Sequence, residues 1–307
     1  MIISASRRTD IPAFYSEWFV NRLKEGYVLI PNPRNAGRLS RAELSPDNVD
    51  CIVFWTKDPL PMLEKLEQID AMGYDYYFQF TLTAYGRTVE PNLPSKGELA
   101  ETLIRLSERI GAERTVWRYD PVIVDPEHTV EWHIRQFAAM CDRLRDHTER
   151  CVISFIDPYK NIDPSFRSMT REEMTAIASA FLEIAKKYGI SLHTCSEEIN
   201  LEKYGVEHSA CIDRALIERI VGCAIDVKKD ANQRGACRCI ESVDIGAYDT
   251  CLHGCKYCYA TSNEKTARRR AGAHDPNHPS LIGYVRGDEK VTDRTAASQK
   301  SKQIRLL

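Results

Sequence analysis

In the stretch Cys251-Leu-His-Gly-Cys255-Lys-Tyr-Cys258, three cysteines stand at a C-x3-C-x2-C spacing, with an aromatic residue directly before the third. Cysteine thiolates are the usual ligands of iron–sulfur clusters. Three thiolates on one short loop can hold three irons of a [4Fe–4S] cube and leave the fourth iron open to a small molecule. The same cysteines would also suit zinc or a closed cluster that takes a fourth ligand from elsewhere. A loop that binds no metal is the remaining alternative.

The cysteines are unevenly distributed along the chain. Eight of the eleven follow residue 190, and the other three, Cys51, Cys141 and Cys151, stand in apolar contexts. The N-terminus has no basic segment followed by an apolar one, so we read no signal peptide. No apolar run is long enough to span a bilayer. We therefore expect a cytoplasmic protein, in which thiols stay reduced and cysteines point to metal rather than to disulfides.

Four further cysteines form a second candidate metal set: Cys195, Cys211, Cys237 and Cys239. Four thiolates complete a tetrahedral set for a closed [4Fe–4S] cluster or a structural zinc ion. We expect iron–sulfur rather than zinc, because the loop at 251–258 already predicts one such cluster. Alternatively, Cys195 and Cys211 are small buried apolar residues, since free cysteine is among the most buried residue types.

Short apolar runs alternate with amphipathic stretches through most of the chain. Strands are predicted at Ile2–Ala5, Tyr27–Ile30, Cys51–Trp55, Tyr76–Leu82, Thr115–Trp117, Cys151–Ile156, Ile190–Thr194 and Glu241–Gly246. Helices are predicted at Ser16–Glu25, Leu60–Met72, Lys96–Ile110, Val130–Asp146, Thr170–Tyr188, Ile212–Cys223 and Glu264–Arg270. This alternation indicates an α/β fold of βα units around a parallel sheet. Seven or eight such units favour a (β/α) barrel, complete or partial.

The chain divides into three parts in this interpretation. Residues 1–194 supply βα units of the barrel, and residues 195–271 form a cysteine-rich segment that completes it. Residues 272–307 are rich in Pro, Gly, His and charge, so we expect an irregular tail. Start signals support two helices, because Ser95 and Thr170 are each followed three residues later by a glutamate.

Charged residues follow several predicted strands directly. In a barrel these positions converge on the carboxyl-terminal mouth, where barrel active sites are built. The candidate catalytic residues are Arg7, Arg8, Asp10, Arg118, Asp120 and Asp157. The arginines suit an anionic group, because a guanidinium pairs two oxygens of a carboxylate or phosphate. The aspartates would transfer protons or simply pair with those arginines.

Composition narrows the choice of partner. The chain has 307 residues, 43% of them hydrophobic, and a net charge of −2. These values are ordinary for a globular protein with a full core and argue against a general nucleic-acid-binding surface. We expect a small-molecule substrate and no membrane partner.

The cysteine loop, with Tyr257 before its third cysteine, resembles the cluster motif of the radical S-adenosylmethionine (radical SAM) enzymes. The resemblance implies that the open iron chelates SAM, that an electron from the cluster splits it, and that Tyr257 lies near the adenine. His253 and Gly254, within the loop, become further cofactor contacts, and His253 would hydrogen-bond a sulfide. A reductant such as flavodoxin or ferredoxin is the implied protein partner.

The order of the elements differs from the common radical SAM pattern. In that superfamily the cluster loop follows the first strand, whereas here it follows the last predicted strand. This arrangement resembles a circularly permuted radical SAM barrel. The usual Gly-Gly-Glu run, which holds the SAM amino group, is also missing. Backbone carbonyls or the carboxylate of Asp10 are the candidates for that role.

The whole chain also resembles a bacterial family designated domain of unknown function 1848. The resemblance is carried by Ile3–Asp10, Phe54–Lys57, Arg118–Pro121 and the run from Cys237 to Ala260. It implies an iron–sulfur protein with a barrel-like fold and names no substrate. The predicted function is cleavage of SAM followed by hydrogen abstraction from a substrate. The alternatives are a non-catalytic iron–sulfur protein for electron transfer or redox sensing, and a zinc-stabilised binding module.

Overall fold

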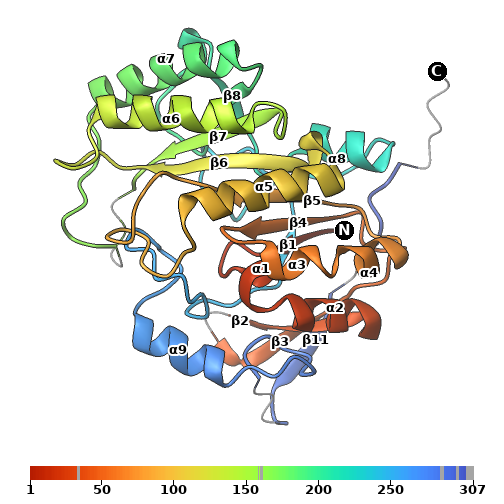
Figure 1. Cartoon of the computed structure of the whole chain (residues 1–307). Helices are drawn as coiled ribbons and strands as arrows, with labels where there is room; N and C mark the ends of the chain where they lie inside the picture. The colour runs from red at the N-terminus through yellow and green to blue at the C-terminus, as the bar shows by residue number, and fades with distance from the viewer. Residues whose placement is uncertain (33–34, 158, 160–161, 284–286, 295–296, 302–307) are drawn as a thin grey trace.

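A computed structural model describes residues 1–32, 35–157, 159, 162–283, 287–294 and 297–301 (Figure 1). Its centre is a sheet of eight strands in the order β10-β1-β4-β5-β6-β7-β8-β9, and every neighbouring pair is parallel. The strands are β1 (Ile2–Ala5), β4 (Cys51–Thr56), β5 (Tyr76–Thr81), β6 (Thr115–Val122), β7 (Arg150–Phe155), β8 (Ser191–Cys195), β9 (Glu207–Ser209) and β10 (Val243–Asp244). The predicted α/β class is confirmed.

Helices connect these strands, as parallel pairing requires. They are α1 (Ile11–Phe14), α2 (Ser16–Glu25), α3 (Leu60–Leu63), α4 (Leu66–Ala71), α5 (Lys96–Ile110), α6 (Val130–Leu144), α7 (Arg171–Lys187), α8 (Arg214–Val221) and α9 (Glu264–Gly272), with single 3-10 turns at Ala112–Arg114 and Glu202–Tyr204. The predicted start signals are confirmed, because Ser95 and Thr170 form capping boxes with Glu98 and Glu173. Among the described helices, none combines the length and apolar character that crossing a bilayer requires.

One predicted strand forms, but not in the main sheet. The segment at Tyr27–Ile30 forms β2 (Tyr27–Asn32), which pairs antiparallel with β3 (Asn35–Glu43) in a separate small sheet. The main strands β1 and β4 are buried almost throughout, whereas buried and partly exposed residues alternate along β2. Alternation is typical of a strand with only one face on the core, and continuous burial is typical of a parallel sheet covered on both faces.

The C-terminal segment is more regular than expected. Within 272–307, β11 (Lys290–Asp293) pairs parallel with β3 and completes the small sheet. In the described part of the chain, β9 and β10 are the two edges of the main sheet, so its eight strands remain open. The strand that precedes the cysteine loop, β10, lies beside β1, with Ile3 opposite Val243 and Ser4 opposite Asp244.

The two faces of the main sheet carry separate apolar cores. The larger core lies under the helices and includes Phe54, Phe78 and Phe137. The smaller core lies on the other face, where Val53, Tyr77 and Val116 of the strands meet α8. Adjacent strand residues such as Val53 and Phe54 therefore point to opposite cores, as the two-residue period of a strand dictates. The second cysteine set belongs to the smaller core.

Candidate functional site

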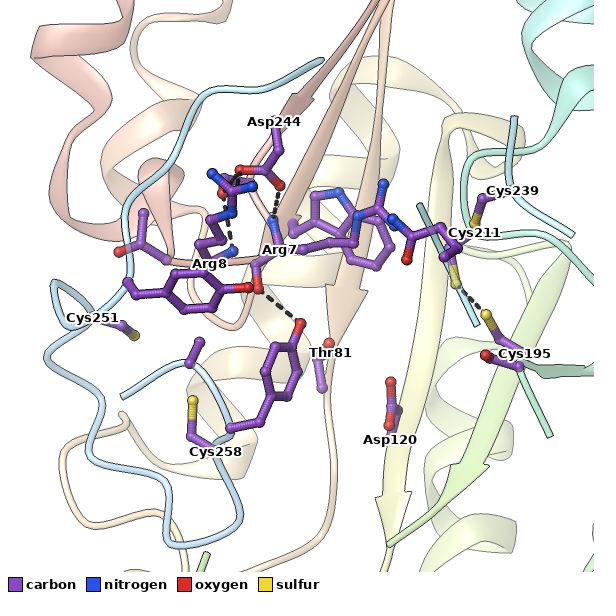
Figure 2. Close-up of a pocket in the computed structure, with 18 of the residues that line it drawn as sticks. Arg7, Arg8, Thr81, Asp120, Cys195, Cys211, Cys239, Asp244, Cys251 and Cys258 are labelled. Carbon is purple, nitrogen blue, oxygen red and sulfur yellow. Dashed lines mark hydrogen bonds and ion pairs between the residues drawn. The ribbon is translucent and has the colours of Figure 1, made fainter. Parts of the chain in front are cut away.

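A cavity of about 1040 Å³ opens where the main strands end. Both cysteine sets line it, together with residues that follow β1, β4 and β7 and with Arg118, Asp120 and Pro121 in the second half of β6. Figure 2 shows Cys251 and Cys258 on one side of the cavity and Cys195, Cys211 and Cys239 on the other. The six predicted catalytic residues also line this cavity. The residues that the sequence placed at strand ends therefore lie around one cavity.

Side-chain and backbone hydrogen bonds hold the cysteine loop against the segment that follows β5. The Asn92 side chain donates to the Leu252 carbonyl at 2.9 Å, and the Lys256 amide donates to the Val89 carbonyl at 3.0 Å. Gly254 has a left-handed φ of +69°, and a Cβ there would lie 3.0 Å from the Asn92 amide nitrogen. Gly254 thus supplies a turn and a close approach, and it is not among the residues that line the cavity.

The three cysteines of this loop are partly buried, and the thiols of Cys255 and Cys258 lie close enough to influence that of Cys251. Burial raises the pKa of the Cys251 thiol well above its usual range, and the charges of Asp10, Cys258 and Cys255 add to the effect. Burial also raises the pKa of Cys255 to about 12, although Lys57 opposes the shift. A bound metal reverses this balance, because coordination deprotonates a thiol outright. The donor set therefore fits a cationic metal centre.

His253 gives a second sign of fit. Its Nε2 atom lies 2.8 Å from an Asp10 carboxylate oxygen, which also accepts from the Lys57 amide at 2.7 Å. The other Asp10 oxygen accepts from the Ala13 amide at the start of α1. His253 is buried, yet its Nδ1 atom has no hydrogen-bond partner among the described residues. An orphaned buried nitrogen on a residue that lines the cavity is a position that a cluster atom or ligand would satisfy.

Tyr257 anchors the loop through a buried carboxylate. Its hydroxyl donates to Glu90, which also accepts from Lys57 Nζ at 2.8 Å, from Thr83 Oγ1 at 2.9 Å and from Lys96. Burial opposes the charge of Glu90, but the two lysines lower its pKa to about 2. The Tyr257 ring remains at the cavity wall, while its hydroxyl is committed to Glu90.

The second cysteine set converges from three parts of the chain. Cys195 ends β8, Cys211 follows β9, and Cys237 and Cys239 precede β10; all four are buried. The sulfur atoms of Cys195 and Cys211 lie 2.8 Å apart without a disulfide bond. Hydrogen bonds from Cys195, Cys211 and Cys237 lower the pKa of the Cys239 thiol. Four buried sulfurs gathered around Cys239 form a donor set that suits a metal centre with four sulfur ligands.

Among the residues that the structure describes, no group of three or more His, Cys, Asp or Glu side chains meets the geometry of a metal-ion site. The fit of both sets therefore rests on burial, sulfur contacts and the orphaned histidine nitrogen. Three of the cysteines, 211, 237 and 239, are under 5% exposed inside an apolar core. Packing as apolar residues explains their burial, but it does not explain why the sulfurs of Cys195, Cys211 and Cys237 gather around Cys239.

Most of the predicted charged residues are paired, but only Arg118 and Asp120 pair with each other. Asp120 accepts from Arg118, and Asp157 accepts from Arg234 at 2.6 Å. Arg8 lies 3.8 Å from Asp244, and Arg7 lies 4.0 Å from Asp230 and donates to Ser242 at 3.2 Å. Pairing with arginine thus applies to Asp120 and Asp157, while Asp10 is held by two amides and His253.

Several cavity residues are absent from the sequence prediction. Lys57 follows β4 as the predicted residues follow their strands, so the same signal could have found it. The ring of Trp55, on β4, has the guanidinium groups of Arg7 and Arg118 at 5.6 and 5.3 Å from its centroid. Glu197 has a pKa raised to about 8, chiefly by burial. Neither the pairing of Glu90 nor the burial of Glu197 has a local sequence signal.

Aromatic rings surround the cavity mouth. Tyr159, Tyr248 and Tyr259 are each about two-fifths exposed and line the cavity. Tyr159 and Tyr259 face each other with centroids 5.4 Å apart, and Arg8 lies 5.3 Å from the Tyr248 ring. The mouth therefore offers π surfaces beside positive charge, which suits planar or anionic groups.

Fold and site together define an α/β protein with a parallel eight-stranded sheet and two cysteine sets around one cavity. The chain belongs to the family described as "Domain of unknown function (DUF1848)", which matches residues 2–260. No curated protein matches it. A solved structure, a putative alpha-L-fucosidase from Bacteroides thetaiotaomicron, shares 9% identity with a TM-score of 0.23, over 58% of this chain and 75% of that one. A likeness this low has no bearing on function.

Proposed function

We propose that this protein is an iron–sulfur enzyme of the radical SAM type. In this proposal Cys251, Cys255 and Cys258 hold an open-site [4Fe–4S] cluster that binds SAM, and a small-molecule substrate occupies the cavity. The observation that carries the proposal is the cavity itself, which the three loop thiols line at the carboxyl-terminal ends of parallel strands. Ligands bind at this edge in open and closed α/β sheets.

The order of the strands supports a circularly permuted radical SAM barrel. The cysteine loop follows β10, which comes last in the main sheet by sequence but pairs with β1, which comes first. Joining β10 and its loop ahead of β1 would reproduce the strand–loop order of the superfamily. A permuted chain keeps the same contacts when its original ends lie close together.

The residues of this chain have definite roles in the proposed reaction. When bound, the cluster would supply the electron that cleaves SAM. Asp10 orients the His253 ring, and Glu90 fixes Tyr257 and Lys57 at the cavity wall. Because Asp10 already accepts three hydrogen bonds, backbone carbonyls are the better partners for the SAM amino group. The tyrosines and Arg8 at the mouth would hold the substrate.

The second cysteine set would hold a closed metal centre, a [4Fe–4S] cluster in preference to zinc. Its four sulfurs satisfy the ligand count of either group. A reductant of the flavodoxin or ferredoxin kind would deliver electrons. If the two metal sites carried out no SAM chemistry, the protein would serve in electron transfer or redox sensing. This is the second candidate function, because the Gly-Gly-Glu run that usually holds SAM is missing.

Anaerobic reconstitution tests the proposal. We expect the wild-type protein to bind iron and sulfide and, once reduced by dithionite, to convert SAM into 5′-deoxyadenosine. The variant C251A/C255A/C258A should lose that conversion, whereas C223A, which removes a cysteine outside both sets, should retain it. A colourless zinc protein, or an iron–sulfur protein whose spectrum ignores SAM and forms no 5′-deoxyadenosine, would exclude the radical SAM assignment.

A further inference from the structure

Arg118 touches a sulfur of the second cysteine set directly. This β6 residue is 6% exposed, and its Nη1 atom donates to Cys211 Sγ at 2.6 Å and to Gln79 Oε1 at 3.4 Å. Its Nη2 atom donates to Asp120 at the cavity wall. A single buried guanidinium thus spans the distance from a thiol of the second set to a carboxylate of the cavity.

The contact is built by neighbouring strands. Gln79 and Tyr77 of β5 donate to the Cys211 carbonyl at 2.8 and 2.7 Å, which fixes the backbone of that cysteine. Trp55 of β4 covers the guanidinium at 5.3 Å. Ser154 of β7 donates to Asp120 from the far side. Four adjacent strands therefore hold Arg118, and its position does not depend on a mobile surface side chain.

The charge of Arg118 is permanent, because a guanidinium does not lose its proton in proteins. An arginine placed against a cluster thiolate affects the reduction potential of the cluster. Reduction adds a negative charge, which a nearby cation and a hydrogen bond to sulfur stabilise.

We propose that Arg118 is the positioning residue that raises the reduction potential of the metal centre held by Cys195, Cys211, Cys237 and Cys239. Asp120 opposes it with its negative charge and links that centre to the substrate cavity. This inference rests on the part of the proposed function that places an iron–sulfur cluster on the second set. It does not require SAM chemistry at the first set.

The test measures the second centre alone, in a C251A/C255A/C258A background reconstituted with iron and sulfide. R118Q should keep its iron and show a lower midpoint potential in an EPR-monitored redox titration. R118K, which keeps the charge but not the fork of donors, should lie between R118Q and the parent. D120N should shift the potential in the opposite direction, because it removes a negative charge. R150Q is the matched control, since Arg150 is on adjacent β7 and pairs with Asp213 at 2.7 Å.

Equal potentials in R118Q and R150Q, with iron retained, would overturn the proposal. If R118Q fails to fold, R118K and D120N provide the test instead. A midpoint potential that is unchanged in both of these variants would also overturn the proposal. A folded background protein without iron would show that the second set holds no cluster. In that case SAM cleavage by the wild-type protein would still stand as evidence for the first centre, so the two failures are distinguishable.

Discussion

Glu90 connects the cysteine loop to the sheet through one carboxylate. It is 1% exposed and accepts hydrogen bonds from two lysines, a threonine and Tyr257. Removing one partner from a buried ion pair leaves the other charge uncompensated, which is far more costly than losing a surface pair. The loop therefore depends on a residue more than 150 positions away in the sequence.

We expect Glu90→Ala to lower the free energy of unfolding by about 3–5 kcal/mol, because Lys57 and Lys96 would lose their buried counter-charge. Chemical denaturation of the metal-free protein measures this change. Glu101→Ala is the control, since Glu101 forms an exposed pair with Arg143 and should cost less than about 1 kcal/mol. Similar costs for the two variants would contradict the anchoring role.

His133 makes the stability pH-dependent. It is fully buried between the Tyr119 hydroxyl and the Ile123 carbonyl, and burial lowers its pKa to about 4. In the unfolded chain a histidine titrates near 6.5, so the unfolded state takes up the proton first as the pH falls. The stability linked to His133 is therefore complete above about pH 6.5 and lost progressively down to about pH 4, by at most about 3 kcal/mol.

The variant His133→Gln tests this dependence. Its free energy of unfolding should fall less than that of the wild-type protein between pH 7 and pH 4.5, because the histidine term is gone. Carboxylates titrate in both proteins, so only the difference between the two curves is informative. Parallel curves would show that His133 is not the group responsible.

At the scale of elements, the contact between β10 and β1 places the cysteine loop. Gly246 follows β10, and a Cβ there would lie 2.0 Å from Ser6 Oγ and 2.5 Å from Ser6 Cβ. Ser6 in turn donates to Asp244 at 2.6 Å and accepts from the Arg8 amide at 3.0 Å. The end of β1 and the start of the loop are thus packed against each other with no space for a side chain.

We expect Gly246→Ala to destabilise the protein by about 1–3 kcal/mol through overpacking. Gly235→Ala is the matched control, because a Cβ at Gly235 meets no atom within 4 Å. In a Ser6→Gly background the cost of Gly246→Ala should fall, since the clashing atoms are gone. A double-mutant cycle from thermal or chemical unfolding measures this coupling, and strict additivity would argue against the contact.

The burial pattern of each strand explains where sequence interpretation succeeds. Strands β1 and β4 are continuous apolar runs because both faces of the main sheet are covered, and this property is visible in the sequence. The segment that forms β2 has a similar composition but pairs with β3, with Tyr27 opposite Glu43 and Asn32 opposite Asn35. The choice of partner strand depends on hydrogen bonds to residues outside the segment. The apolar run at residues 27–30 therefore could not show which sheet its strand would join.

At the scale of the molecule, two separate metal centres would face one cavity from opposite sides (Figure 2). Because the two sets come from different segments and share no cysteine, their losses should be additive. Relative to wild type, we expect C237A/C239A and C251A/C255A/C258A each to lose about half of the bound iron, and the combined variant to lose all of it. Iron and sulfide analysis after anaerobic reconstitution checks this. Loss of all iron in either partial variant would indicate one shared centre.

Local spacing by itself determined several features of this protein. These features each lie within a short segment: the C-x3-C-x2-C loop, the Cys-x-Cys pair, the capping boxes, and the apolar strands and amphipathic helices that alternate along the chain. Their interactions act over a few residues, so the pattern carries the information. The sequence also predicted that the polar residues at the strand ends meet, because parallel strands bring their carboxyl ends to one edge of the sheet.

Only the tertiary structure decided which of these residues meet. The Tyr257–Glu90 hydrogen bond joins residues 167 positions apart, and the Arg118–Cys211 contact joins residues 93 apart. Such contacts depend on strand order and on the closure of long loops, which no periodicity in one segment encodes.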